Sequence, residues 1–359
     1  MATGKRTCAH TAKTRGRLGA GASYLRALPP YPGGKRRLLP AILGLIDIVC
    51  PQASWPDLLF ADPFLGGGAV ALAAKAQGFG HIVANDIAER STLVGRGLLA
   101  NHRVRLAPAA VLRLFTAAPE VHLAPPGLFR RMPDRHRALL ENAWRHLYGG
   151  TFPGVERDLI ALLMLKWLFA YFPLGLPAAT DAHRIVDGDF DPVTGARLAH
   201  YLRRGRRLLQ PATLLTIADQ VNLGIFPGTA DVSQMDVFDF LPSARADIVY
   251  LDPPYGGTQP YEMALMLVDE FIGAGPPPLS RFSSRWPPLD ELLETCSHIP
   301  VLVLSLGNSL LDEEGARALV ARHRRVHRLL SLPYRHYGAV ASPAKNAGNR
   351  EFLILGTLK

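Results

Sequence analysis

The chain has 359 residues, of which 48% are hydrophobic and 19% charged, so it can bury a sizeable core and wholesale disorder is excluded. Forty Lys and Arg against thirty Asp and Glu give a formal net charge of +10, which favours a polyanionic partner. Most of these cations are arginines, which suit phosphate and guanine contacts but also accompany the Ala-, Gly- and Pro-rich composition of a GC-rich genome.

Cysteine spacing and hydropathy exclude several other classes. The three cysteines, Cys8, Cys50 and Cys296, lie far apart, which argues against a disulfide framework or a zinc knuckle and favours a reducing, cytoplasmic location. The twelve histidines are scattered along the chain, so no metal site is expected. The apolar stretch 159–172 carries Lys166 at its centre and is short for a bilayer, so we expect a buried helix and no membrane partner.

The N-terminal segment, residues 1–23, is basic and lacks apolar periodicity, so it is predicted to be a flexible arm. Nine cations precede the first acidic residue, Asp47. Such an arm can grip phosphates, or it can be a solvated tail without a specific role.

Short apolar runs, each followed by glycines or acidic residues, begin at Leu58. They are LLFADPFLGGGAV (58–70), HIVAND (81–86), ADIVYLDPPYGG (246–257) and IPVLVLSLGNS (299–309). Helical patterns at 290–296 and 313–323 separate the later runs. Buried strands that alternate with helices predict an α/β fold with a doubly wound, Rossmann-like parallel sheet.

The Arg-rich segment 88–230 interrupts this alternation and is predicted to be a mainly helical insertion. The expected catalytic domain therefore comprises residues 24–87 and 231–359. A Pro-rich stretch, 273–288, is predicted to be a long surface loop. Several arginine clusters have two possible roles: they can contact phosphates or guanine, or they can form a solvated face. These arginines are Arg130, Arg131, Arg135, Arg137, Arg203, Arg204, Arg206, Arg207, Arg322, Arg324, Arg325 and Arg328.

Three consecutive glycines, Gly66 to Gly68, follow the first predicted strand and open a helix, so that backbone can approach a ligand closely. Asp86 ends the next strand, where a carboxylate can accept both ribose hydroxyls of a nucleoside. Gly66, Gly68, Ala71 and this acid also satisfy the dinucleotide fingerprint, so a nicotinamide-dependent oxidoreductase stays open on these residues.

The tetrapeptide Asp252-Pro253-Pro254-Tyr255 follows the apolar run at 248–251, at the sheet edge where α/β proteins bind ligands. Methylation of an exocyclic base amine needs two acceptors, because the lone pair of the nitrogen is delocalised into the ring. The Asp252 carboxylate and the Pro253 carbonyl can supply them, since two prolines restrain this backbone. Tyr255 offers a face on which an extruded base can stack. An oxidoreductase has no use for this arrangement.

The sequence resembles the Dam-like class-alpha adenine-N6 DNA methyltransferases, which use S-adenosyl-L-methionine. The resemblance rests on three stretches in the family's order, Tyr31-Pro32-Gly33-Gly34-Lys35, Asp62-Pro63-Phe64-Leu65-Gly66-Gly67-Gly68 and Tyr250-Leu251-Asp252-Pro253-Pro254-Tyr255. Weaker similarities to the family's motifs occur at Tyr261, Leu304-Ser305 and Arg350-Glu351-Phe352-Leu353-Ile354. Phe172-Pro173-Leu174-Gly175 departs from the Phe-Asn-Gly turn that many members carry.

The resemblance implies a role for each matched residue. Tyr31, Gly33, Gly34 and Lys35 would hold the methionine end of the cofactor, Asp62, Phe64, Gly66 and Gly68 would line its binding loop, and Asp86 would take its ribose. Asp252 would be catalytic, with Pro253, Pro254 and Tyr255, and would also border the cofactor. Asp236 would lie beside the cofactor adenine, with Asp231 and Asp239 as alternatives.

The implied activity is site-specific methylation of the N6 amine of an adenine flipped out of double-stranded DNA. The insertion would then read the target sequence, a cognate restriction endonuclease would be a possible partner, and the enzyme would be associated with the nucleoid. The alternatives are an RNA adenine methyltransferase and a non-catalytic protein that binds cofactor and DNA.

Overall fold

The computed structural model describes residues 22–31, 33–122, 134–171, 210–254, 265–273, 280–283, 287–334 and 348–359. Several residues discussed above lie outside this part of the chain. They are the arm up to residue 21, Pro32, Arg130, Arg131, Phe172 to Gly175, Arg203 to Arg207, Tyr255 and Tyr261. For Arg135 the structure describes the helical backbone alone.

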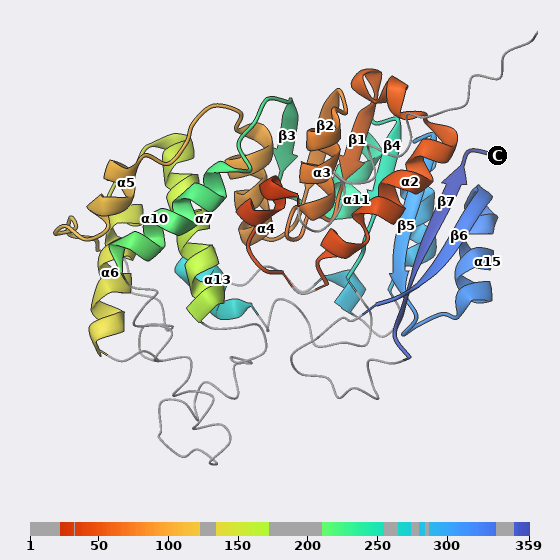
Figure 1. Ribbon diagram of the computed structural model, residues 1–359. Helices are drawn as coiled ribbons and strands as arrows, with labels where there is room; N and C mark the ends of the chain where they lie inside the picture. The colour runs from red at the N-terminus through yellow and green to blue at the C-terminus, as the bar shows by residue number, and fades with distance from the viewer. Residues whose placement is uncertain are drawn as a thin grey trace, which may run out of the picture.

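A seven-stranded sheet with the order β3-β2-β1-β4-β5-β7-β6 forms the centre of the protein (Figure 1). Its strands are β1 (Leu59–Asp62), β2 (His81–Asn85), β3 (Ala230–Ser233), β4 (Ile248–Leu251), β5 (Val301–Gly307), β6 (Arg325–Pro333) and β7 (Arg350–Thr357). The order reverses between β1 and β4, as in doubly wound sheets, which confirms the predicted fold class.

One strand departs from the predicted parallel sheet. β7 pairs antiparallel with both β5 and β6, whereas the pairs from β3 across to β5 are parallel. Consecutive strands can pair antiparallel without a crossover helix, and β6 and β7 are such neighbours. The direction of β7 brings Glu351, at the beginning of this strand, opposite Gly307 at the end of β5.

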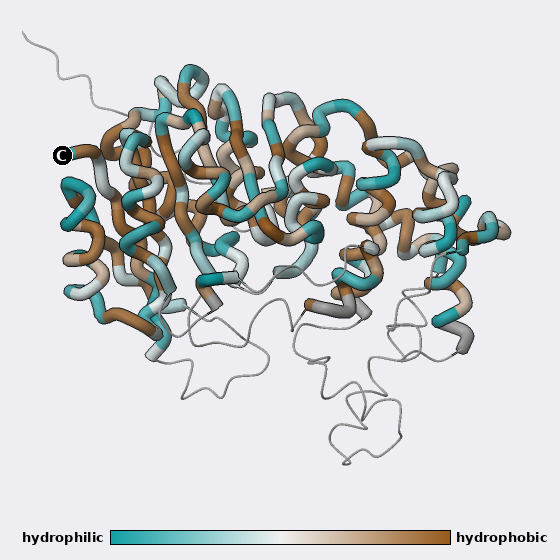
Figure 2. The backbone as a smooth tube through the Cα atoms, turned by 180° about the vertical axis from the view of Figure 1, so that it is seen from behind, coloured by the Kyte–Doolittle hydropathy of each residue, from teal (hydrophilic) through white to brown (hydrophobic). Residues whose placement is uncertain are grey.

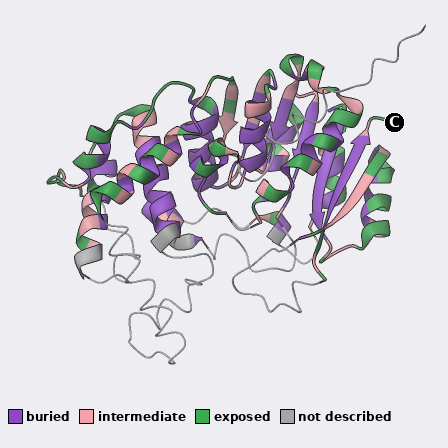
Figure 3. Ribbon diagram, viewed as in Figure 1, coloured by how far each residue is buried: buried purple, intermediate pink, exposed green. Residues whose placement is uncertain are grey.

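Two hydrophobic clusters cover the two faces of the sheet, because successive side chains of a strand point in opposite directions. On β4, Ile248 and Tyr250 belong to one cluster, and Val249 and Leu251 to the other. Helices α2 (Leu39–Val49) and α3 (Ala69–Gln77) cover the first face, and α11 (Val237–Phe240), α14 (Leu289–Thr295) and α15 (Glu313–His323) the second. Figure 3 shows the central strands buried beneath these helices, and Figure 2 shows from behind how hydrophobic and hydrophilic residues alternate along the chain.

The described part of segment 88–230 is mainly helical, as predicted, apart from β3 at its end. Its helices are α4 (Glu89–Val94), the π-helical segment η4 (Gly95–Ala100), α5 (Pro108–Arg113), α6 (Asp134–Tyr148), α7 (Gly154–Tyr171) and α10 (Pro211–Asn222). They gather beside the β3 edge of the sheet (Figure 1). Leu98, Leu162 and Leu214 belong to the same core cluster as Phe60 of β1, so packing joins these helices continuously to the sheet.

The apolar helix α7 is buried, and its central cation has a local explanation. Lys166 donates hydrogen bonds to the carbonyl oxygens of Arg26 (2.7 Å) and Leu28 (2.9 Å), and burial lowers its pKa to about 7. Lys166 thus ties the first described turn, η1 (Ser23–Ala27), to α7. None of the described helices combines the length and apolarity that a membrane crossing requires.

The arginines near the C-terminal end of the chain, at 322–328, have different roles in the fold. Arg324 is buried and donates hydrogen bonds to the carbonyl oxygens of Ile299 (2.9 Å) and Cys296 (2.5 Å). Arg322 pairs at 2.7 Å with Asp290 on α14. The sequence predicted that Arg324 either contacts phosphate or lies on a solvated face. Both predictions are wrong, because its guanidinium is buried and donates hydrogen bonds to backbone carbonyls inside the fold.

Candidate functional site

The site lies where the strand order reverses, at the carboxyl ends of β1, β2 and β4. An open cavity occupies this position, with an empty volume of about 990 Å³ that includes open solvent. Its walls include Tyr31, Gly33, Gly34, Lys35, Asp62, Phe64, Gly66, Asp86, Asp236, Asp252, Pro253 and Pro254. The fold thus brings all the described predicted site residues except Gly68 to one cavity.

The glycine turn forms the floor beside β1. Gly66 (φ 49°) and Gly68 (φ 74°) adopt left-handed backbone conformations that favour glycine. The ring of Tyr31 packs on this turn so closely that a Cβ on Gly67 would lie 2.6 Å from the Tyr31 Cβ. Gly68, which was predicted to line the cofactor loop, does not border the cavity. It is the N-cap of α3 and faces Val94, whose Cγ1 would lie 2.9 Å from an added Cβ.

Asp86 connects β2 to the glycine turn. Its Oδ2 accepts a hydrogen bond from the Gly66 amide (2.7 Å), and its Oδ1 accepts one from the Ala88 amide (2.9 Å). Burial raises the pKa of Asp86, and these backbone donors and Arg90 oppose that rise. Each carboxylate oxygen has a further lone pair, so Asp86 can still accept hydrogen bonds from a ligand in the cavity.

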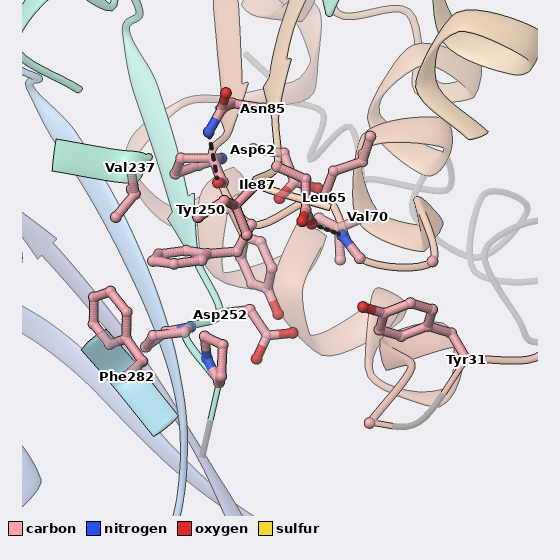
Figure 4. A pocket seen from close by; sticks show the side chains of 18 of the residues that line it. Tyr31, Asp62, Leu65, Val70, Asn85, Ile87, Val237, Tyr250, Asp252 and Phe282 are labelled. Carbon is pink, nitrogen blue, oxygen red and sulfur yellow. Dashed lines mark hydrogen bonds between the residues drawn. The ribbon is translucent and has the colours of Figure 1, made fainter. Parts of the chain in front are cut away.

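Lys35 lies against the tetrapeptide. Its Nζ is 2.8 Å from Oδ1 of Asp252, 3.6 Å from Oε1 of Glu351 and 3.0 Å from the carbonyl oxygen of Gly33. Burial lowers the pKa of Lys35, but Asp252 and Glu351 outweigh this effect and raise it above its ordinary value. Burial raises the pKa of Asp252 to about 6, against the opposing effect of Lys35 and with a further contribution from Glu351. In Figure 4 the Asp252 carboxylate points into the cavity.

Asp62 ends β1 on the other side of the strand reversal from Asp252. It is 2% exposed, and its Oδ1 has no hydrogen-bond partner. Burial, together with the charges of Asp252 and Asp86, raises the pKa of Asp62 to about 8. This side chain borders the cavity (Figure 4), so a bound ligand can satisfy the oxygen that the protein leaves unpaired.

The Asp62→Asn variant is expected to be more stable than the wild type above neutral pH. Because the folded-state pKa of Asp62 is raised, ionisation of this carboxyl group is less favourable in the folded state than in the unfolded state. The wild-type protein therefore loses stability as the pH rises from about 4 through about 8. The gain from Asp62→Asn should therefore grow over this interval and reach a few kcal/mol at pH 9. Urea unfolding at pH 5, 7 and 9 measures it, and a gain independent of pH would contradict the assignment.

Two aromatic side chains, Phe64 and Phe282, line the cavity. Phe282 is 2% exposed, stacks on Phe238 with ring centroids 5.8 Å apart, and meets Phe64 edge to face at 5.2 Å. The guanidinium of Arg281 lies 4.4 Å from the centroid of the Phe238 ring. The surface-loop prediction for 273–288 is therefore wrong at Phe282, because tertiary packing buries this aromatic among prolines against β1 and α11.

Of the three acids considered for the adenine side, Asp236 alone borders the cavity. It is the N-cap of α11 and accepts a hydrogen bond from the Phe238 amide at 2.9 Å. Asp231 is 80% exposed on β3 and pairs with His81 at 2.9 Å. The separation of these acids comes from the turn after β3.

Arg90 is a cavity residue that the sequence analysis missed. It is 4% exposed and pairs at 2.6 Å with Asp269, which is 1% exposed on α13 (Met266–Phe271). Its Nε has no hydrogen-bond partner. No local pattern distinguishes it from the other arginines of the insertion; only the packing of α4 against α13 reveals the pair.

Replacing Arg90 by Leu is expected to destabilise the protein by about 3–5 kcal/mol, because the buried charge of Asp269 would lose the Arg90 guanidinium. The double variant Arg90→Leu, Asp269→Leu should recover much of this loss, since it removes both charges. Urea unfolding of the single and double variants tests this. A double variant as unstable as the single one would mean that lost packing, not the uncompensated charge, dominates.

The comparisons with known proteins bear on the segment that carries most of these residues. The family model of D12 class N6 adenine-specific DNA methyltransferases matches residues 31–122. Residues 31–122 of this chain are therefore similar to that methyltransferase family. The matched region includes Tyr31, Lys35, the glycine turn and Asp86, and it confirms the family resemblance recognised in the sequence.

No curated protein matches the chain. Among solved structures, the rRNA methyltransferase aviRa from Streptomyces viridochromogenes matches at 12% sequence identity and a TM-score of 0.35, over 99% of this chain and 96% of that chain. Among the described residues, no three His, Cys, Asp or Glu side chains are grouped so that they could hold a metal ion.

Proposed function

We propose that the protein is an S-adenosylmethionine-dependent DNA methyltransferase that acts on the N6 amine of a flipped adenine. The observation that carries this proposal is the meeting of Asp252-Pro253-Pro254 with Lys35, the glycine turn and Asp86 around one cavity. Tyr255 lies outside the described residues, and its stacking role stays a prediction from the sequence. The family match of residues 31–122 supports the reaction class.

The cavity residues suit the chemistry of S-adenosylmethionine. Asp86 can accept from ribose hydroxyls, and the buried and unpaired Oδ1 of Asp62 can accept from an ammonium group. The rings of Phe64 and Phe282, which line the cavity, can contact an adenine. Tyr31, Gly33, Gly34 and Lys35 would hold the methionine end. Gly66 would form the loop beside it, and Asp236 would accept from the adenine amine.

The protein's own groups would act through hydrogen bonding and charge. When bound, the cofactor supplies an electrophilic sulfonium methyl group. Asp252 and the Pro253 carbonyl would accept from the two N–H groups of the target amine, which concentrates its lone pair on nitrogen and stabilises the positive charge formed on attack. The new N–C bond forms as the S–C bond breaks, the electron pair goes to sulfur, and the excess proton leaves the nitrogen for solvent. Positioning supplies the rest of the acceleration.

Further parts of the proposal concern the partner. The net charge of +10 favours a nucleic acid, and the family match favours DNA. We assign target reading to the helical segment 88–230 and propose phosphate contacts for the basic arm, residues 1–23. A nucleoid location in the cytoplasm and a cognate restriction endonuclease are compatible with this assignment.

The test is transfer of labelled methyl groups from S-adenosylmethionine to unmethylated genomic DNA, with RNA in parallel. Label recovered as N6-methyladenine in DNA supports the proposal. Label in RNA alone assigns an RNA methyltransferase. Binding of S-adenosylhomocysteine and DNA without transfer assigns a non-catalytic role. Thermal stabilisation by NAD and not by S-adenosylhomocysteine would favour an oxidoreductase instead.

A further inference from the structure

Glu351, on β7, lies next to the proposed catalytic carboxylate although it is distant in sequence. It is fully buried, and its Oε1 accepts a hydrogen bond from the Ser305 hydroxyl of β5 at 2.5 Å. The same Oε1 lies 3.6 Å from Nζ of Lys35. Ser305 therefore fixes Glu351, and Glu351 lies on one side of an ammonium group whose other side contacts Asp252.

Lys35 thus serves two carboxylates with one positive charge. Its Nζ lies 2.8 Å from Oδ1 of Asp252 and 5.5 Å from the centroid of the Tyr334 ring. Tyr334 is itself held by a hydrogen bond from its hydroxyl to the Gly34 carbonyl (3.0 Å). Lys35 contacts Oδ1 of Asp252, and the Asp252 carboxylate points into the cavity that this residue lines.

We propose that Glu351 is a positioning residue for the methyl transfer: it shares the Lys35 ammonium with Asp252, so that the free oxygen of Asp252 stays a strong acceptor for the target amine. This inference rests on the proposed function. If Lys35 were neutralised by Asp252 alone, the carboxylate would be more firmly paired and a weaker hydrogen-bond acceptor. Glu351 would touch neither substrate nor cofactor and would act through Lys35.

The groups that face Asp252 from the surrounding elements set the direction of the effect. Lys35 lowers its pKa, and Glu351 raises it. Asp62 on β1 is a further nearby acid, and the hydroxyls of Tyr250 and Tyr334 complete the surroundings. Neutralising Glu351 removes a repelling charge while Lys35 remains, so Asp252 should lose its proton at lower pH.

The experiment is the pH dependence of single-turnover methyl transfer by Glu351→Gln, which keeps an acceptor for Ser305. The acid limb is expected to move to lower pH by about one unit. The plateau rate should fall about tenfold, because the acceptor is weaker. Glu351→Asp keeps the charge and should return the limb to the wild-type position. Glu294→Gln, an exposed change of the same charge on α14, should leave the profile unchanged.

A second readout needs no turnover. With aspartate labelled at 13Cγ, the Asp252 resonance is identified by its loss in Asp252→Asn, and its titration is compared between wild type and Glu351→Gln. An unchanged titration in folded Glu351→Gln overturns the inference, whatever happens to the rate. A wild type that transfers no methyl group to DNA or RNA, while the titration shifts, refutes the proposed function and leaves the charge sharing established. If Glu351→Gln does not fold, Ser305→Ala, which frees Glu351 from β5, must shift the titration for the inference to stand.

Discussion

Replacing Asp252 by Ala is expected to lower the rate of methyl transfer by about 10³-fold or more, judged from the cost of removing one preorganised hydrogen-bonding group in other active sites. The variant removes the carboxylate that contacts Lys35 at 2.8 Å and points into the cavity. Affinity for S-adenosylhomocysteine should fall about tenfold at most, the equivalent of one hydrogen bond. Single-turnover rates at saturating cofactor, together with calorimetric titration, separate the two effects.

Asp231→Ala is the matched control, because Asp231 is an exposed aspartate on β3 that does not border the cavity. It should retain wild-type rates. If Asp252→Ala, folded and still able to bind S-adenosylhomocysteine, methylated DNA within tenfold of the wild-type rate, the catalytic assignment would be wrong.

Replacing Lys35 by Met is expected to destabilise the fold by about 3–5 kcal/mol at pH 7, because Asp252 and Glu351 would remain as buried carboxylates without their cation. Lys35 normally holds down the pKa of Asp252, so its loss raises that pKa further above the unfolded value. An acid with a raised folded-state pKa binds its proton more tightly in the folded state, so stability is recovered as pH falls. Urea unfolding at pH 5 and 7 should therefore show a smaller deficit at pH 5.

Lys75→Met provides the matched comparison. Lys75 is also buried, but it donates to the carbonyl oxygens of Leu98 (3.0 Å), Leu99 (2.8 Å) and Asn101 (3.1 Å). Burial lowers its pKa to about 8, so Lys75 keeps its charge at both pH 5 and pH 7. Its loss should cost stability equally at the two pH values. The same recovery in both variants would show that the carboxylates do not cause the pH dependence of Lys35→Met.

The sequence by itself determined the elements of the catalytic half. The runs at 58–70, 81–86, 246–257 and 299–309 became β1, β2, β4 and β5, because buried parallel strands need continuous apolar runs and their ends need turn residues. The chemistry-bearing residues follow these runs directly. Their meeting at one cavity then follows from the strand reversal between β1 and β4.

Only the tertiary structure decided which charges and rings meet. Lys35 and Glu351 are more than 300 residues apart in sequence, and the antiparallel course of β7 brings them together. Arg90, Phe282 and Arg324 looked like surface residues of polar or Pro-rich segments, yet each is buried by elements distant in sequence. Local patterns report the period of an element and its ends, whereas burial and charge pairing depend on which elements pack together.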